Sequence, residues 1–509
     1  MIRSSIFNIL KRFSKEEIIR LEAFIDSPYH NKSKKLKLFF KKIKKLYPDF
    51  EQSNSDKINL IKRRNSSLDY NDSTFRNLMS DLLCLIEKFL TVEKLFDNEW
   101  ERNVFLLKSL IEKNQDALFE KNIEKSKFEL EGKGIDSTFY YNKSLVELCK
   151  YNFNLINRKE NSVGVIENNT TIISSYILYL VTFFITELIN SYLKLSIYEL
   201  KFNKRDKKNS VLQLLEIINI KEICKYFRKT SEDPYIIEMY LQLFLCFHEI
   251  ENQEHFIKYR SLIFRFSGSF SKDELSYHYS MMISYCVIKN SICRDKSPMD
   301  IELFEVYIMF LKEKLFIDEK TLCLDEDLYR NILITSLRLK KYSWTLDFIH
   351  NYSKYLHPEK VKNLVDLSYA EYNYQMGSES GSHQVLEKAF NHLNRIHDES
   401  IIIKYDIKTL YLMLYYDLNY VGENILTQLN NYRRFLRRNK LVSDIRKKRL
   451  NKFLNLFEKL VFLKTGDPKI DVSELYLDIL TSDGLTQYEW LLKKIQELNT
   501  RNTSKIKYS

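Results

Sequence analysis

The chain has 509 residues, a formal net charge of +12 and 44% hydrophobic residues, and aromatic residues make up 14% of the chain. With 9 glycines and 6 prolines, helix breakers are scarce, which argues against β-sandwiches, β-barrels and long disordered linkers. Strand-like runs are short, such as residues 163–166. The composition therefore predicts an all-α protein with an ample core, and the length alone predicts about three domains of ~150 residues.

The N-terminal apolar run, residues 6–10, is too short for a secretory signal because Lys11 and Arg12 follow it directly. The cysteines are odd in number, widely spaced and mostly on apolar helix faces. We therefore interpret them as reduced core residues of a cytoplasmic protein. They are Cys84, Cys149, Cys224, Cys246, Cys286, Cys293 and Cys323.

Four helices are expected at the N-terminus. Ser14 and Glu17 form a predicted capping box at the start of the first, and Pro28 follows its end. The others are predicted over residues 32–47, 56–64 and 74–90. We predict that residues 1–92 form a small N-terminal helical domain. It resembles a helix-turn-helix DNA-binding module, but residues 65–71 are too long for the tight turn of that module, and a terminal cap on a helical stack is the commoner arrangement.

Residues 93–230 are expected to form a packing region of longer helices, over residues 100–111, 117–130 and 137–157. Within this region, residues 170–186 form a run of seventeen positions without a charged residue, near the lower limit for a membrane-spanning helix. Because the run contains four threonines and two serines, and Glu187 follows it, we interpret it as a buried core helix and expect no membrane partner.

Residues 231–499 are predicted to form helical hairpins, and residues 500–509 a frayed tail. Pro234 is placed to begin one of these helices. The clearest hairpins lie between residues 325 and 463, with turns expected at Lys340 and Lys341, over residues 377–381, and near residue 420. These turns are separated by about 38 and 41 residues, a spacing typical of helical repeats. A hairpin of this size cannot cover its own apolar face, so neighbouring hairpins are expected to stack.

Three small residues, Ala370, Ser382 and Ala389, fall where close helix approach is needed if a repeat begins at Asn363. On these residues the stretch resembles the tetratricopeptide (TPR) family. The preceding hairpin departs from the family pattern, because bulky Ile334 and Leu346 occupy two corresponding positions and no proline closes the repeat. The resemblance implies stacked antiparallel helical hairpins, a TPR-like α-solenoid with a concave groove for a protein or peptide partner.

The positive charge is concentrated in two windows. Residues 32–45 contain eight lysines and no acidic residue, and residues 433–449 contain nine basic residues and one acidic residue. Each window carries +8, so the rest of the chain is net acidic. Localised positive charge is expected of a surface that binds phosphates or acidic partners. The simpler interpretation is a solvent-exposed helix face that binds nothing. The candidate partner-binding residues are Arg433, Arg434, Arg437, Arg438 and Lys440. The candidate nucleic-acid contacts are Lys34, Lys35, Lys41, Lys42 and Lys45.

Motifs for catalysis are incomplete. The sequence has no phosphate-binding loop of the GxxxxGK[ST] type, and Asn252 stands where a zinc-protease helix starting at His248 would need its second histidine. Lys464, Thr465 and Gly466 match one motif of penicilloyl-serine enzymes, but that triad belongs on a strand and this segment is predicted to be helical. We therefore expect no enzyme activity, no cofactor, no metal and no small-molecule substrate.

Two functions fit these patterns. The first is a non-enzymatic helical-repeat scaffold that binds a protein or peptide, with the arginine cluster setting its charge preference. The alternative is a nucleic-acid-associated regulator, in which the N-terminal helical domain and the basic residues contact DNA or RNA.

Overall fold

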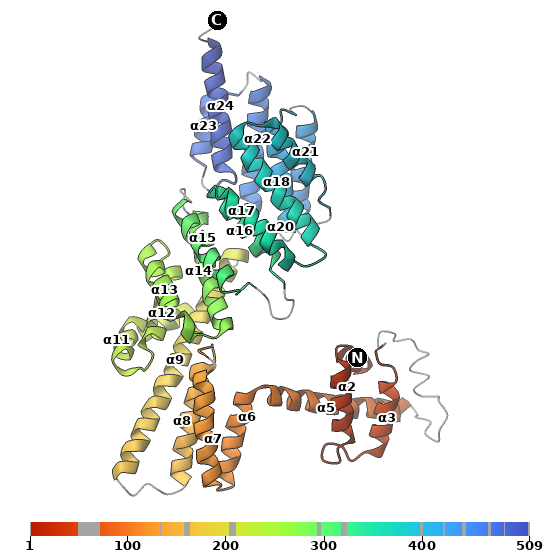
Figure 1. Ribbon diagram of the computed structural model, residues 1–509, viewed down its shortest axis with the longest axis vertical. Coiled ribbons are helices and arrows are strands. Elements are labelled where there is room, and N and C mark those ends of the chain that lie inside the picture. The colour runs from red at the N-terminus through yellow and green to blue at the C-terminus, as the bar shows by residue number, and fades with distance from the viewer. Residues whose placement is uncertain are drawn as a thin grey trace. The chain divides into compact units, whose positions relative to one another are not determined.

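The computed structural model describes residues 2–48, 72–132, 134–156, 163–202, 210–292, 297–316, 323–397, 401–420, 423–439, 444–466, 470–482 and 484–506. Within these ranges every regular element is an α-helix or a short 3-10 helix, so the predicted all-α class is confirmed for them (Figure 1). The chain divides into two compact units: Met1–Leu130 with Asn142–Tyr176, and Glu131–Tyr141 with Ile177–Ser509. The predicted divisions after residues 92, 230 and 499 stay predictions.

The N-terminal helices share one hydrophobic core. They are α1 (Ile2–Leu10), α2 (Lys15–Asp26), α3 (Lys34–Lys44) and α5 (Asp72–Asp97). The predicted capping box begins α2: Ser14 Oγ accepts from the Glu17 N–H at 3.1 Å, and Glu17 Oε2 accepts from the Ser14 N–H at 2.6 Å. The most deeply buried side chains of this core include Leu21, Phe39, Phe40, Phe75, Leu82 and Ile86. The helix predicted over residues 56–64 lies outside the described residues.

Three further helices follow in the first unit: α6 (Glu99–Glu112), α7 (Asp116–Gly132) and α8 (Phe139–Ile156). Phe119 of α7 and Phe153 of α8 stack with ring centroids 4.1 Å apart, and both side chains are buried. The long helices predicted between residues 100 and 157 are therefore present, and aromatic packing joins two of them.

Helix α9 (Val163–Phe202) begins at residues 163–166, which had a strand-like composition. Within Val163–Ile197, one window of 18 residues reaches a mean hydropathy of 1.9, and this is, among the described helices, the one long and apolar enough to span a membrane. Ile185 and Ile189 are buried, whereas Ile177 and Phe184 are each 46% exposed. Burial is thus divided between its faces, and its interpretation as a core helix stays a prediction.

The connection between α7 and α8 belongs to the second unit. The Ile135 N–H donates to the Ser269 carbonyl at 2.8 Å, and the Ser271 N–H donates to the Ile135 carbonyl at 2.9 Å. Tyr140 Oη donates to Asp233 Oδ2 at 2.9 Å. Ile135 and Tyr140 are therefore fixed by hydrogen bonds to residues more than 90 positions later in the chain.

The rest of the second unit consists of successive helices, and most helices that are consecutive in the chain pack against each other (Figure 1). The first are α10 (Ser210–Ile218), α11 (Ile220–Thr230), α12 (Pro234–His248), α13 (Gln253–Phe266), η2 (Ser267–Ser269), α14 (Lys272–Ile292) and α15 (Ser297–Lys312). Then follow α16 (Glu326–Arg338), α17 (Tyr342–Tyr352), η3 (Ser353–Tyr355), α18 (Val361–Ser380), α19 (His383–Leu393), α20 (Ile401–Asp417), α21 (Glu423–Arg438), α22 (Asp444–Thr465), α23 (Val472–Leu480) and α24 (Tyr488–Ile506).

The expected turns at Lys340 and near residue 420 are present, whereas the one over residues 377–381 is displaced. Lys340 lies between α16 and α17 with φ +56°. Helix α18 continues through Gly377, and Gly381 ends it with φ +67°. Gly377 serves close packing instead, because a Cβ at this position would lie 2.9 Å from the Leu386 side chain. Ala370 and Ala389 are also fully buried, so α18 and α19 approach each other over small residues.

Candidate functional site

The predicted arginine cluster lies at the C-terminal end of α21, which packs against α22. Arg433 is half-buried and bonds to α22, with Nη2 2.8 Å from Glu458 Oε2 and 2.7 Å from Asn455 Oδ1. Arg434, Arg437 and Arg438 are exposed, and no acidic partner for them is found among the described residues. We call these three residues the arginine surface. Lys440, the fifth predicted member, lies outside the described residues.

The predicted lysines of α3 divide between two sides of the helix. On the side facing α2, Lys37 donates to the Asp26 carbonyl, and Lys44 pairs with Glu22. Lys34, Lys35, Lys41 and Lys45 are exposed, and Lys42 is half-buried. Among these, Lys41 lies 3.6 Å from Asp26, with 52% of its side chain exposed. The structure therefore places all five predicted nucleic-acid contacts on one helix and its C-terminal cap residue.

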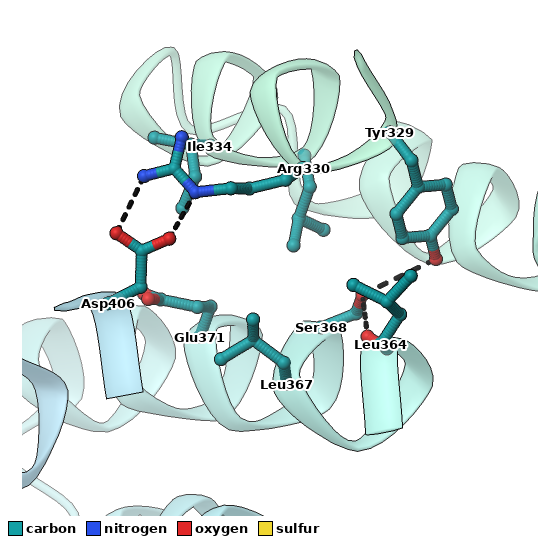
Figure 2. Close-up of a pocket in the computed structure, with 9 residues that line it drawn as sticks. Tyr329, Arg330, Ile334, Leu364, Leu367, Ser368, Glu371 and Asp406 are labelled. Atoms are coloured by element: carbon teal, nitrogen blue, oxygen red, sulfur yellow. Dashed lines mark hydrogen bonds and ion pairs between the residues drawn. The ribbon is translucent and has the colours of Figure 1, made fainter. Parts of the chain in front are cut away.

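A charged cavity that the sequence did not reveal lies between α16, α18 and α20. Figure 2 shows Arg330 of α16 facing Asp406 of α20 in a two-point ion pair, with Nη2 2.6 Å from Oδ1. Glu371 of α18 lines the same cavity. The cavity has about 10 Å³ of water-accessible space, close to the volume that one water molecule needs. It therefore has no room for a substrate.

Glu371 has an unusual protonation behaviour. Burial, reinforced by the negative charge of Asp406, raises its pKa from 4.5 to about 8, while the positive charge of Arg330 opposes the increase. The carboxyl group of Glu371 is therefore largely protonated at neutral pH. A neutral Glu371 avoids placing an uncompensated negative charge beside the ion pair of Arg330 and Asp406.

A second polar cluster missed by sequence reasoning joins α12, α13 and α14. Tyr240 Oη donates to Glu274 Oε1 at 2.6 Å, Tyr259 Oη lies 2.7 Å from His278 Nδ1, and His278 Nε2 lies 3.4 Å from Glu274 Oε1. Burial raises the pKa of Glu274, but the interaction with His278 and the hydrogen bond from Tyr240 outweigh it and lower the pKa below its ordinary value. All four side chains are at most 7% exposed, so the cluster stabilises packing and is closed to substrates.

Asp417 is the centre of a third buried polar cluster. Lys494 Nζ lies 2.8 Å from Asp417 Oδ1, and Tyr374 Oη donates to Asp417 Oδ2 at 2.8 Å. Trp490 Nε1 lies 3.4 Å from the same Oδ2. These contacts join the ends of α18 and α20 to α24, so the C-terminal helix is attached to the hairpins through a buried charge as well as through apolar packing.

The described residues bring together no three histidine, cysteine, aspartate or glutamate side chains that could hold a metal ion. His248 is the last residue of α12, and His255 Nδ1 lies 2.8 Å from Gln242 Oε1. Lys464 and Thr465 end α22, so the triad at residues 464–466 is not on a strand. A groove of about 380 Å³ between α23 and α24 is lined by Val472, Ser473, Tyr476, Leu477, Ile495, Gln496 and Asn499, none of which is charged.

The free cysteines of the described residues form no disulfide. Cys149, Cys224, Cys246 and Cys286 are buried as predicted, and burial raises the pKa of each thiol. Cys84 is exposed, in contrast to the predicted core position, because it lies on the outward side of α5. Cys293 lies outside the described residues.

Comparison with protein-family models, curated proteins and solved structures finds no match to this chain. The functional argument therefore depends on the placement of its own charged residues.

Proposed function

We propose that this chain is a non-enzymatic scaffold, with TPR-like stacking of the hairpins within residues 325–463, that binds an acidic protein or peptide at the arginine surface. The observation that carries the proposal is the contrast within one cluster. Arg433 is bonded to α22, whereas Arg434, Arg437 and Arg438 remain exposed, and the described residues provide no acidic partner for them. Guanidinium groups form paired hydrogen bonds with carboxylates, and arginine is enriched among residues that dominate binding energy at interfaces.

The support beneath the arginine surface favours a scaffold. Helix α21 packs on α20 and on α22. Its buried residues Ile425, Leu429 and Tyr432 are fully enclosed. Tyr432 Oη also lies 3.1 Å from Thr409 Oγ1 of α20. Because the helix is held by these contacts, its exposed arginines project from a rigid support, which reduces the entropic cost of binding.

Two further observations agree with the scaffold. The charged cavity has only enough space for about one water molecule, so the described residues offer no charged active site there. The close approach of α18 and α19 at Gly377, Ala370 and Ala389 is of the kind that TPR-like stacking requires. We place the scaffold in the cytoplasm as part of the same proposal, since its described cysteines are free thiols.

Affinity capture from lysate of the native host, quantified by mass spectrometry, tests the proposal. In the full chain, the triple variant R434E/R437E/R438E should retain at least tenfold less of an acidic partner than the wild-type chain. The matched control is K229E/K272E/K312E, which makes the same change in net charge at exposed lysines of the same unit. Circular dichroism should show equal helicity in both variants. Equal capture by the two variants would contradict a role for the arginine surface.

A further inference from the structure

We propose that the outward face of α3 binds the phosphate backbone of nucleic acid without selecting a base sequence. This lysine face consists of Lys34, Lys35, Lys41, Lys42 and Lys45. It belongs to the first compact unit, whereas the arginine surface belongs to the second. The inference is therefore independent of the scaffold proposal, and it depends on different residues.

The lysines of α3 differ in whether an acidic residue of α2 lies next to them. The two nearby acidic residues of α2, Glu22 and Asp26, are directed to Lys44 and Lys41. Neither is directed to Lys34, Lys35 or Lys45, for which no ion pair is found among the described residues. The charges of Lys34, Lys35 and Lys45 are therefore not neutralised by α2, and adjacent lysines on a helix face repel one another unless an anion lies against them.

The dimensions of the face fit a nucleic-acid backbone. Positions 34, 38, 41 and 45 lie one helical turn apart on one line, with Leu38 as the single exposed apolar residue between the lysines. At a rise of 1.5 Å per residue, Lys34 and Lys45 are about 16 Å apart along the helix axis. A duplex presents roughly nine or ten phosphates over that length, so every lysine of the face can reach one.

The buried side of α3 argues against a membrane as the partner. Its apolar residues Leu36, Phe39, Phe40 and Ile43 are at most 3% exposed, because they pack into the N-terminal core. A helix that lies on a membrane needs its apolar face for insertion. With that face already occupied, the lysine face can bind only through its charge.

The residue type argues for phosphates over an acidic protein. Lysine is depleted at protein–protein interfaces, where arginine is enriched. Its ammonium group acts as a hydrated point charge without a fixed geometry, which suits the regularly repeated phosphates of a backbone.

Fluorescence anisotropy with a labelled 25-base-pair duplex of mixed sequence tests the inference on the full chain. Wild-type affinity should fall about 500-fold between 50 and 200 mM salt when all five lysines contact phosphates, and a duplex of a second sequence should bind within about twofold of the first. The variant K34E/K35E/K45E should bind at least tenfold more weakly at 50 mM salt, and its salt slope should be about three units shallower. A neutral variant, K34Q/K35Q/K45Q, should lose affinity in the same direction.

The matched control is K108E/K113E/K121E, which makes the same charge change at exposed lysines of the same unit. It should bind the duplex within about twofold of the wild type, and circular dichroism should show unchanged helicity for all variants. Absence of binding at 50 mM salt, or equal losses in the test and control variants, would overturn the inference. So would tighter binding to vesicles of anionic lipid, or to a polyglutamate peptide, than to the duplex.

Discussion

Arginine has opposite roles in two regions of the second unit. Between α16 and α20, the side chains of Arg330 and Asp406 are only 19% and 16% exposed and form a two-point ion pair. At the end of α21, Arg434, Arg437 and Arg438 are exposed, and the described residues offer them no acidic partner. The difference shows that an arginine contributes to the fold only where a neighbouring helix places a carboxylate opposite it. An arginine opposite a carboxylate of a packed helix holds the fold, whereas one that faces solvent remains available to another molecule.

The largest effect should come from removing one partner of the enclosed ion pair. Asp406→Ala leaves the Arg330 guanidinium without its counter-charge, and we expect the free energy of unfolding to fall by about 3–5 kcal/mol. Urea denaturation followed by circular dichroism measures the loss. The double variant R330M/D406L, which replaces the pair by apolar side chains, should recover most of it. A loss below about 1 kcal/mol in the single variant would mean that the pair is solvated and that the contrast between the two regions is wrong.

A smaller, pH-dependent effect is expected at Glu371. Its pKa is about 8 in the folded chain and about 4.5 when unfolded, so the folded chain holds a proton that the unfolded chain releases between these values. The stability that this proton contributes is complete below pH 4.5 and is lost as the pH rises through 8. The difference between these two pKa values corresponds to at most about 5 kcal/mol. Because Glu371 is only half-buried and solvent weakens the effect, Glu371→Gln, which stays neutral, should gain about 1–2 kcal/mol relative to wild type at pH 9 and almost nothing at pH 4.5. Urea denaturation at the two pH values measures this difference. An equal shift at both would exclude titration of Glu371 as its cause.

The smallest effect on stability should come from the arginine surface. Because Arg434, Arg437 and Arg438 are exposed, the variant R434A/R437A/R438A should unfold within about 0.5 kcal/mol of the wild type. The comparison variant is Arg433→Ala, which removes the bonds to Glu458 and Asn455 and should cost more. Thermal unfolding of both variants ranks them. If the triple variant lost more stability than Arg433→Ala, the exposed arginines would have a structural role.

Local signals in the sequence were sufficient to predict where helices form, but not which helices pack against one another. The scarcity of glycine and proline predicted an all-α chain, and the Ser14 capping box marked the start of α2 to the residue. The turn predicted over residues 377–381 was displaced. Two glycines in a short segment favour a turn, but Gly377 lies inside α18, and the helix ends at Gly381. Gly377 is needed for the approach of Leu386, which a single sequence does not reveal.

The basic windows were visible in the sequence, but their division into bonded and available residues was not. Arg433 and Arg434 are neighbours with identical side chains, and only the position of α22 separates their roles. The buried cluster around Arg330 was out of reach for the same reason, since Asp406 follows it by 76 residues. Among evenly distributed carboxylates, the sequence gives no sign that this one faces an arginine.

The segment Glu131–Tyr141 belongs to the second unit although the residues on either side of it belong to the first, and this affects how the polypeptide can be divided into fragments. Because Ile135 bridges Ser269 and Ser271, and Tyr140 in the first turn of α8 bonds to Asp233, the segment Glu131–Tyr141 belongs with the later helices although most of α8 follows it. The two units are therefore interleaved along the backbone, and no single cut yields both of them intact. A fragment intended to reproduce the larger unit has to supply the segment Glu131–Tyr141, either by retaining α8 and α9 or by adding it as a separate peptide.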